Sequence, residues 1–248
     1  MFMAKIARFP SASSQVKREE TLLRRLSDMH VSGVPEIVLS GAYGGRSFLV
    51  ERRVEGRRLK GSNFSSAEKL QMKLDWMKTF YSQTKGGSIR SQELVRRAEE
   101  VLNFTNEFAD LTEAIAVLDK CKPTNDIPTV CIHGDADDIN FLSTQSGVVA
   151  VDFALSKFDE PPCDPYSFVS AEALPQRMRQ LDVLSVLEGV DPFFLAIYSN
   201  IIHLGENLRL IRNLEENLFL IDTLREFPSR ELGRIDELLQ CYHSSRGS

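Results

Sequence analysis

The sequence has 248 residues, of which 42% are hydrophobic and 26% are charged, a composition typical of a globular protein with a substantial core. It contains no apolar run near the roughly 20 residues that span a bilayer and no apolar core of signal-peptide length. No membrane partner is therefore expected. The cysteines lack the close spacing of metal or redox sites, which predicts reduced thiols and a cytoplasmic protein; they are Cys121, Cys131, Cys163 and Cys241.

The formal net charge of −5 is divided unevenly along the chain. Residues 1–64 contain 12 Lys and Arg against 6 Asp and Glu, whereas residues 65–248 contain 18 against 29. A basic first part suits nucleotide phosphates, and an acidic remainder would attract a cationic small-molecule acceptor; ordinary variation of surface charge is the alternative. No basic patch with interleaved aromatic residues is present, which argues against nucleic-acid binding.

The first 60 residues predict a small lobe of about three strands and one helix. Strands are expected at 2–9, 37–39 and 47–51, and a helix is expected at about 14–30. Glycines between the second and third strands indicate a hairpin turn, which is a better interpretation of them than a phosphate-binding loop.

Residues 61–248 predict a second, mainly helical lobe. Ser65 and Glu68 form a capping box that opens a helix to about Thr84. The apolar residues of this helix, Trp76 among them, fall at helical spacing, which indicates core rather than a ligand cage. Further helices are expected at about 91–108, 111–121, 171–187, from 192 to an interruption at Pro228, and at 229–242, with a strand at 129–132. The predicted fold class is α+β.

The most informative segment follows the strand at 129–132. It places Asp135, Asn140 and Asp152 within about 20 residues, which supplies two carboxylates and an amide oxygen. Phosphoryl transfer from a magnesium nucleotide needs a carboxylate to accept the hydroxyl proton and oxygen ligands to hold the metal. Each residue alone could belong to a turn, but the three together favour this chemistry. Asp137 and Asp138 face either an acceptor or solvent, and we expect solvent.

The same segment resembles the aminoglycoside phosphotransferase and choline kinase-like family, which has the protein kinase-like fold. His133-Gly134-Asp135 matches the motif of that family, in which Gly replaces the Arg of protein kinases. Pro161-Pro162-Cys163-Asp164 resembles the Pro-x-x-Asp that follows its metal site. Residues 48–59 are similar to its hinge strand and the next turn. Ala4-Lys5-Ile6 and the helix after it are similar to the elements that carry a phosphate-binding Lys and its Glu partner.

The resemblance spans about residues 4–170 and implies a role for each matching residue. Asp135 would be the catalytic base, and Asn140 and Asp152 would hold Mg²⁺. His133 and Asp164 would support the catalytic loop.

The resemblance also implies a nucleotide site. Lys5 would contact the phosphates of ATP, and Glu19 would hold Lys5. The adjacent Glu20 is a rival, but Glu19 is favoured because the apolar residues four and seven positions further on place it on the inward side of the helix. Backbone groups from Glu51 to Arg53 would bind the adenine. A surface Lys and a surface Glu are the alternative for Lys5 and Glu19.

One departure from the family concerns the N-terminus. The family has two strands and a phosphate-covering loop before the Lys strand, whereas only four residues precede Lys5. We therefore expect a truncated N-terminal lobe, as in a naturally shortened variant, a fragment, or a coding sequence begun too late. An exposed Lys5 strand would favour self-association.

The function implied is ATP-dependent phosphorylation of a hydroxyl on an aminoglycoside, sugar or amino alcohol. A weakly active or inactive kinase-like binding protein is the alternative. A scaffold without a nucleotide site is a third and less favoured interpretation.

Overall fold

The computed structural model describes residues 1–8, 12–105, 110–168, 189–214 and 226–246. Contacts divide the chain into two compact units. Among the described residues, the first unit comprises 1–87 and 129–164 and the second comprises 88–128 and 165–246. Every predicted site residue belongs to the first unit. The functional lobes expected to divide near residue 60 stay a prediction.

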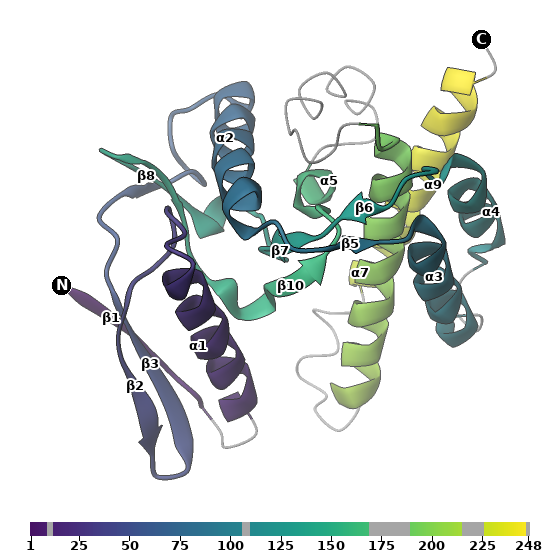
Figure 1. Cartoon of the computed structure of the whole chain (residues 1–248). Coiled ribbons are helices and arrows are strands. Elements are labelled where there is room, and N and C mark those ends of the chain that lie inside the picture. The colour runs from purple at the N-terminus through teal and green to yellow at the C-terminus, as the bar shows by residue number, and fades with distance from the viewer. Residues whose placement is uncertain (9–11, 106–109, 169–188, 215–225, 247–248) are drawn as a thin grey trace. The chain divides into compact units, whose positions relative to one another are not determined.

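A three-stranded antiparallel sheet begins the first unit (Figure 1). Its strands β1 (Phe2–Ile6), β2 (Ile37–Tyr43) and β3 (Arg46–Arg52) stand in the order β1-β3-β2. Gly44 and Gly45 turn the β2–β3 hairpin with φ angles of 56° and 76°, which glycine adopts without a steric penalty. The register of β1 on β3 pairs Lys5 with Leu49. Among the described strands, β1 has only β3 beside it.

The helix α1 (Ser13–Asp28) packs on β3. Leu22, Leu23 and Leu26 recur along its inward side and are buried, as is Leu49 of β3. This burial of leucines at helical spacing stabilises the helix against the sheet. Glu19 lies on the same inward side and is only 2% exposed.

The helix α2 (Ser66–Thr84) begins at the predicted capping box, with Ser65 as the N-cap residue. Trp76 stacks on Phe80 with ring centroids 4.4 Å apart and meets the edge of Phe141 at 5.3 Å. His133 packs against Phe153 at 4.7 Å in the same aromatic cluster. Trp76 therefore belongs to the core, as its helical spacing predicted.

Short strands carry the loops of the first unit. β4 (Arg57–Arg58), β8 (Phe141–Thr144) and β9 (Gly147–Ala150) form one sheet, and β7 (Val130–Ile132) pairs with β10 (Lys157–Glu160). Single 3₁₀ turns, η2 (Asp138–Asn140) and η3 (Phe153–Leu155), lie beside them. The sequence did not predict β4 or β10, because strands of two and four residues are too short for a periodic signal.

The second unit is mainly helical. It contains β5 (Ser88–Ile89) paired with β6 (Ile127–Pro128), and the helices α3 (Ser91–Thr105), α4 (Thr112–Cys121), α7 (Pro192–Leu214) and α9 (Glu226–Arg246). The helix α5 (Asp164–Phe168) begins at the boundary of the units. The α+β class is thus confirmed.

One helix boundary was wrong. Pro228 lies within α9 (Glu226–Arg246) and does not separate two helices at that point. The helix expected at about 171–187 lies outside the described residues, as do residues 106–109 and 215–225 of other expected helices.

None of the helices described is long and apolar enough to cross a membrane. All four cysteines are free thiols. Burial raises the pKa of Cys121 to about 12, which opposes thiolate formation.

Candidate active site

The predicted catalytic loop begins where β7 ends. Gly134 has a φ of 80°, and a Cβ at this position would lie 2.4 Å from the carbonyl oxygen of Leu155. Both the backbone conformation and the close approach of η3 therefore require glycine in the His-Gly-Asp motif.

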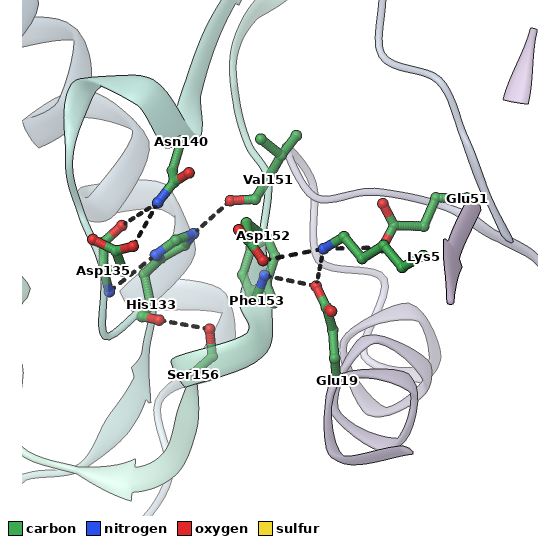
Figure 2. Close-up of polar contacts among 10 residues, drawn as sticks. All are labelled: Lys5, Glu19, Glu51, His133, Asp135, Asn140, Val151, Asp152, Phe153 and Ser156. Carbon is green, nitrogen blue, oxygen red and sulfur yellow. Dashed lines mark hydrogen bonds and ion pairs between the residues drawn. The ribbon is translucent and has the colours of Figure 1, made fainter. Parts of the chain in front are cut away.

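The buried side chains of Asp164 and His133 hold this loop through hydrogen bonds. Asp164 accepts hydrogen bonds from the backbone N–H groups of His133 at 2.7 Å and Gly134 at 2.8 Å, and from the hydroxyl of Tyr81 at 3.0 Å. The ring of His133 is fully buried. Its Nδ1 accepts from the N–H of Asp135 at 3.3 Å, and its Nε2 lies 3.0 Å from the carbonyl oxygen of Val151 (Figure 2). These partners assign the ring proton to Nε2 of a neutral imidazole, and the two hydrogen bonds hold the loop.

Asp135 is exposed at the tip of the loop. The amide nitrogen of Asn140 donates to its Oδ2 at 2.9 Å and to its backbone carbonyl at 3.0 Å. These bonds fix the carboxylate and turn the amide oxygen of Asn140 away from it (Figure 2). An exposed but oriented carboxylate can accept the proton of an approaching hydroxyl.

Asp152 follows β9 in the left-handed conformation, with a φ of 67°. The segment that carries Asp152 is joined to the catalytic loop by a hydrogen bond of 2.8 Å from the N–H of Val151 to the carbonyl of Asn140. The carboxylate is 53% exposed and accepts a hydrogen bond of 3.2 Å from the ammonium of Lys5. Non-glycine residues rarely hold this conformation, and they do so most often at functional sites.

Lys5 and Glu19 form the second half of the site. The Nζ atom of Lys5 lies 2.5 Å from Oε1 of Glu19, and the same oxygen accepts from the N–H of Phe153 at 2.9 Å (Figure 2). Glu19 therefore ties β1 to the segment after Asp152. The rival Glu20 instead accepts from Ser40 and Arg24 on the surface.

Several carboxylates lie near the ammonium group of Lys5. Burial disfavours its ammonium, but the nearby carboxylates of Glu19, Glu51 and Asp152 outweigh this effect and raise its pKa. The third of these carboxylates is unusual. Glu51 is 1% exposed, and neither of its oxygens has a hydrogen-bond partner among the described residues. Burial, which outweighs the attraction of Lys5, raises its pKa to about 7.

The backbone at the end of β3 differs from the expected adenine site. The N–H of Arg53 donates to the carbonyl of Met1 at 3.1 Å, and the N–H of Arg52 donates to the carbonyl of Glu36 at 2.8 Å. Arg53 therefore cannot offer its N–H to a base without losing the Met1 bond. The side chain of Glu51 is a polar group at this position that has no hydrogen bond among the described residues.

One residue that contacts the loop was not predicted from the sequence, and the surroundings of another were predicted wrongly. Lys73 of α2 is buried, and its ammonium donates to the carbonyl of Ala136 at 3.2 Å and lies 2.9 Å from Oδ1 of Asp138. Asp138 thus faces this cation and not only solvent, whereas Asp137 is exposed and caps the N–H of Ile139. Lys73 lies three residues after Leu70 and four before Met77, so its inward position was readable from helical spacing.

Magnesium suits the predicted oxygen ligands. The amide oxygen of Asn140 and the carboxylate of Asp152 lie on segments joined by the backbone bond described above, and Mg²⁺ prefers few protein oxygens combined with phosphate and water. Within the described part of the chain, no three His, Cys, Asp or Glu residues gather as a metal cluster.

Neither a family model nor a curated protein matches the sequence. Solved structures, in contrast, match the fold of this chain. Aminoglycoside 2′-phosphotransferase-IIIa in its GDP complex has a TM-score of 0.59 at 16% identity, covering 94% of this chain and 85% of that chain. The chain has the aminoglycoside phosphotransferase fold.

Two further structures share this fold. A thermostable mutant of aminoglycoside phosphotransferase APH(4)-Ia, in ternary complex with ADP and hygromycin B, has a TM-score of 0.64 at 13% identity, covering 97% of this chain and 86% of that chain. Macrolide 2′-phosphotransferase MphH from Brachybacterium faecium has a TM-score of 0.59 at 14% identity, covering 93% and 84%. Identities this low establish a shared fold and not a shared substrate.

Proposed function

We propose that this protein is an ATP-dependent phosphotransferase that phosphorylates a hydroxyl group of a small molecule. One observation carries the proposal: a single compact unit holds both the oriented carboxylate of Asp135 and the ion-pair network of Lys5, Glu19 and Asp152. Phosphoryl transfer needs these two parts together, because catalysis rests on positioning and on charge stabilisation.

In this proposal different residues contact the phosphates, the base, the metal and the acceptor hydroxyl. Lys5, held by Glu19, neutralises the phosphates, and the end of β3 near Glu51 receives the base. Asn140 and Asp152 would hold Mg²⁺, which would supply positive charge to offset the negative charge of the phosphates. Asp135 orients the acceptor hydroxyl and takes its proton late in the reaction, when the oxygen has become more acidic.

The acceptor is proposed to be an aminoglycoside, a sugar or an amino alcohol. The acidic balance of residues 65–248 favours a cationic acceptor. The neighbours in fold act on aminoglycosides and macrolides according to their names, which is the class of substrate to test first.

The test is ATP turnover with a panel of amino sugars, macrolides and amino alcohols, with Asp135→Asn as the control for background hydrolysis. Turnover that depends on Asp135 supports the proposal. Magnesium-dependent ATP binding without turnover of any acceptor would instead indicate a kinase-like binding protein.

A further inference from the structure

Glu51 is a buried acid with no hydrogen-bond partner among the described residues. Its carboxyl group is 1% exposed, and neither oxygen forms a hydrogen bond. Nζ of Lys5 lies 3.8 Å from Oε1, which is beyond hydrogen-bond distance. An unsatisfied buried polar group of this kind is costly, and native structures rarely keep one without a reason.

The position of Glu51 points to a ligand. Lys5 pairs with Leu49 across the sheet, and residues two apart on a strand share a face, so Glu51 lies on the face of Lys5. It is also the last residue but one of β3, where the base is proposed to bind. The neighbouring N–H groups of Arg52 and Arg53 already have partners, whereas the carboxyl group of Glu51 has no hydrogen-bond partner among the described residues and can be offered to a base.

Four ionisable groups share this environment. Lys5 faces Glu51 from β1, Glu19 faces it from α1, and Asp152 faces it from the segment after β9. Burial raises the pKa of Glu51 most, Lys5 opposes that effect, and the two carboxylates add to it, giving a pKa of about 7. Glu51 therefore changes its proton count near neutral pH.

We propose that Glu51 reads the nucleobase of the donor nucleotide and that the presence of its proton decides which purine fits. This inference rests on the proposed function. Adenine presents an acceptor at N1 and a donor at its amino group, so it needs a carboxyl group that can both donate and accept. Guanine presents two adjacent donors, N1–H and the 2-amino group, which match the two acceptors of an ionised carboxylate.

The experiment compares the binding of ADP and GDP by calorimetry with magnesium, near pH 6 and near pH 8. The ratio of the two affinities is the readout, because the phosphates and Lys5 affect both nucleotides alike. For the wild type, we expect the preference for ADP to fall up to about 100-fold between the two pH values, because the protonated fraction of a group with a pKa of about 7 falls about tenfold and its ionised fraction rises about tenfold.

Two variants test whether hydrogen bonding by the side chain of residue 51 sets the ratio of affinities. In Glu51→Gln, an amide replaces the acid and offers a donor and an acceptor at every pH, so ADP binding should persist with a ratio that no longer changes with pH. In Glu51→Met, a side chain of similar length makes no hydrogen bond, so the ADP preference should be lost at both pH values.

Three results would overturn the inference. One is a wild-type ratio that is equal at both pH values, and another is an unchanged ratio in Glu51→Met. The third is a tripolyphosphate affinity that follows the same pH course as ADP, which would mean that Glu51 acts on Lys5 and not on the base. In each case the proposed function stands, whereas failure of the wild type to bind either nucleotide would overturn both.

Discussion

The ammonium nitrogen of Lys73 lies 2.9 Å from Oδ1 of Asp138, and this ion pair joins α2 to the loop that carries Asp135. The side chain of Lys73 is 5% exposed and that of Asp138 is 31% exposed. The lysine is therefore the partner that depends on the pair, because a buried charge without a counter-charge is strongly destabilising.

The first prediction concerns this pair. Asp138→Asn should lower the free energy of unfolding by about 2 to 3 kcal/mol, below the 3 to 5 typical of fully buried pairs because Asp138 is partly exposed. Adding Lys73→Met to that variant should recover part of the loss, because it removes a buried charge that has lost this counter-charge. Chemical denaturation measures both effects.

The matched control is the exposed pair of Glu93 and Arg96 on α3. Removing either partner there should change stability by less than about 1 kcal/mol. Strict additivity of the Lys73 and Asp138 changes would show that the pair does not couple.

The second prediction concerns the proposed base. Asp135→Asn should reduce the rate of phosphoryl transfer by a factor of about 10² to 10⁴ while leaving the affinity for magnesium-ATP nearly unchanged. The reason is that an amide keeps the hydrogen-bonding shape but accepts no proton. Steady-state kinetics and calorimetry separate the two quantities, and wild-type turnover in this variant would contradict the role of Asp135.

The third prediction concerns the proposed metal ligands. Asp152→Ala should reduce the gain in nucleotide affinity on adding Mg²⁺ by about tenfold or more, and Asn140→Ala should reduce it less, because a carboxylate carries charge and an amide does not. Comparing affinities with and without Mg²⁺ cancels the loss of the Asp152–Lys5 bond. A gain that survives in both variants would exclude this pair as metal ligands.

Much of the site could be predicted from local patterns. Glu19 was distinguishable from Glu20 because helical spacing places it with the buried leucines, and the structure places Glu19 against Lys5. The aromatic core around Trp76 followed from spacing in the same way.

The rest depends on contacts between distant segments. The pairing of Lys73 with Asp138 joins residues 65 positions apart in the numbering, and the bond between Arg53 and Met1 closes off a backbone group that looked available. The lack of a hydrogen-bond partner for the buried carboxyl group of Glu51 could not be predicted either, because it depends on how the whole unit packs and not on the alternating pattern of the strand.

The fourth prediction concerns the glycine of the catalytic motif. Gly134→Ala should lower stability by about 2 to 5 kcal/mol, since alanine at this φ costs about 1 to 2 kcal/mol and the clash with the Leu155 carbonyl adds about 1 to 3. Gly45→Ala is the control: its φ of 76° is similar, but no atom lies within 4 Å of the added Cβ. Denaturation should show a smaller loss for Gly45→Ala, and equal losses would mean that η3 can shift away from the loop.

The fifth prediction concerns stability and pH at Glu51. The folded protein holds the proton of Glu51 up to a pKa of about 7, above the ordinary value of 4.5. Below pH 4.5 the acid is protonated in both folded and unfolded chains, so the raised pKa has no effect. As the pH rises from 4.5 to about 7, only the unfolded chain releases the proton, so the wild type loses stability. Above that range both states have released it, and the deficit stays constant.

Glu51→Gln removes this titration and should therefore gain stability over the wild type across that window. The gain should reach on the order of 3 kcal/mol near pH 7, the equivalent of moving a pKa from 4.5 to about 7, and then level off. Thermal denaturation from about pH 4 to pH 8 measures it. Glu36→Gln, one residue before β2, is the control, because hydrogen bonding to Arg52 lowers the pKa of Glu36 and its removal should act in the opposite direction. A wild type and Glu51→Gln variant with parallel pH profiles would show that Glu51 ionises normally in the folded protein.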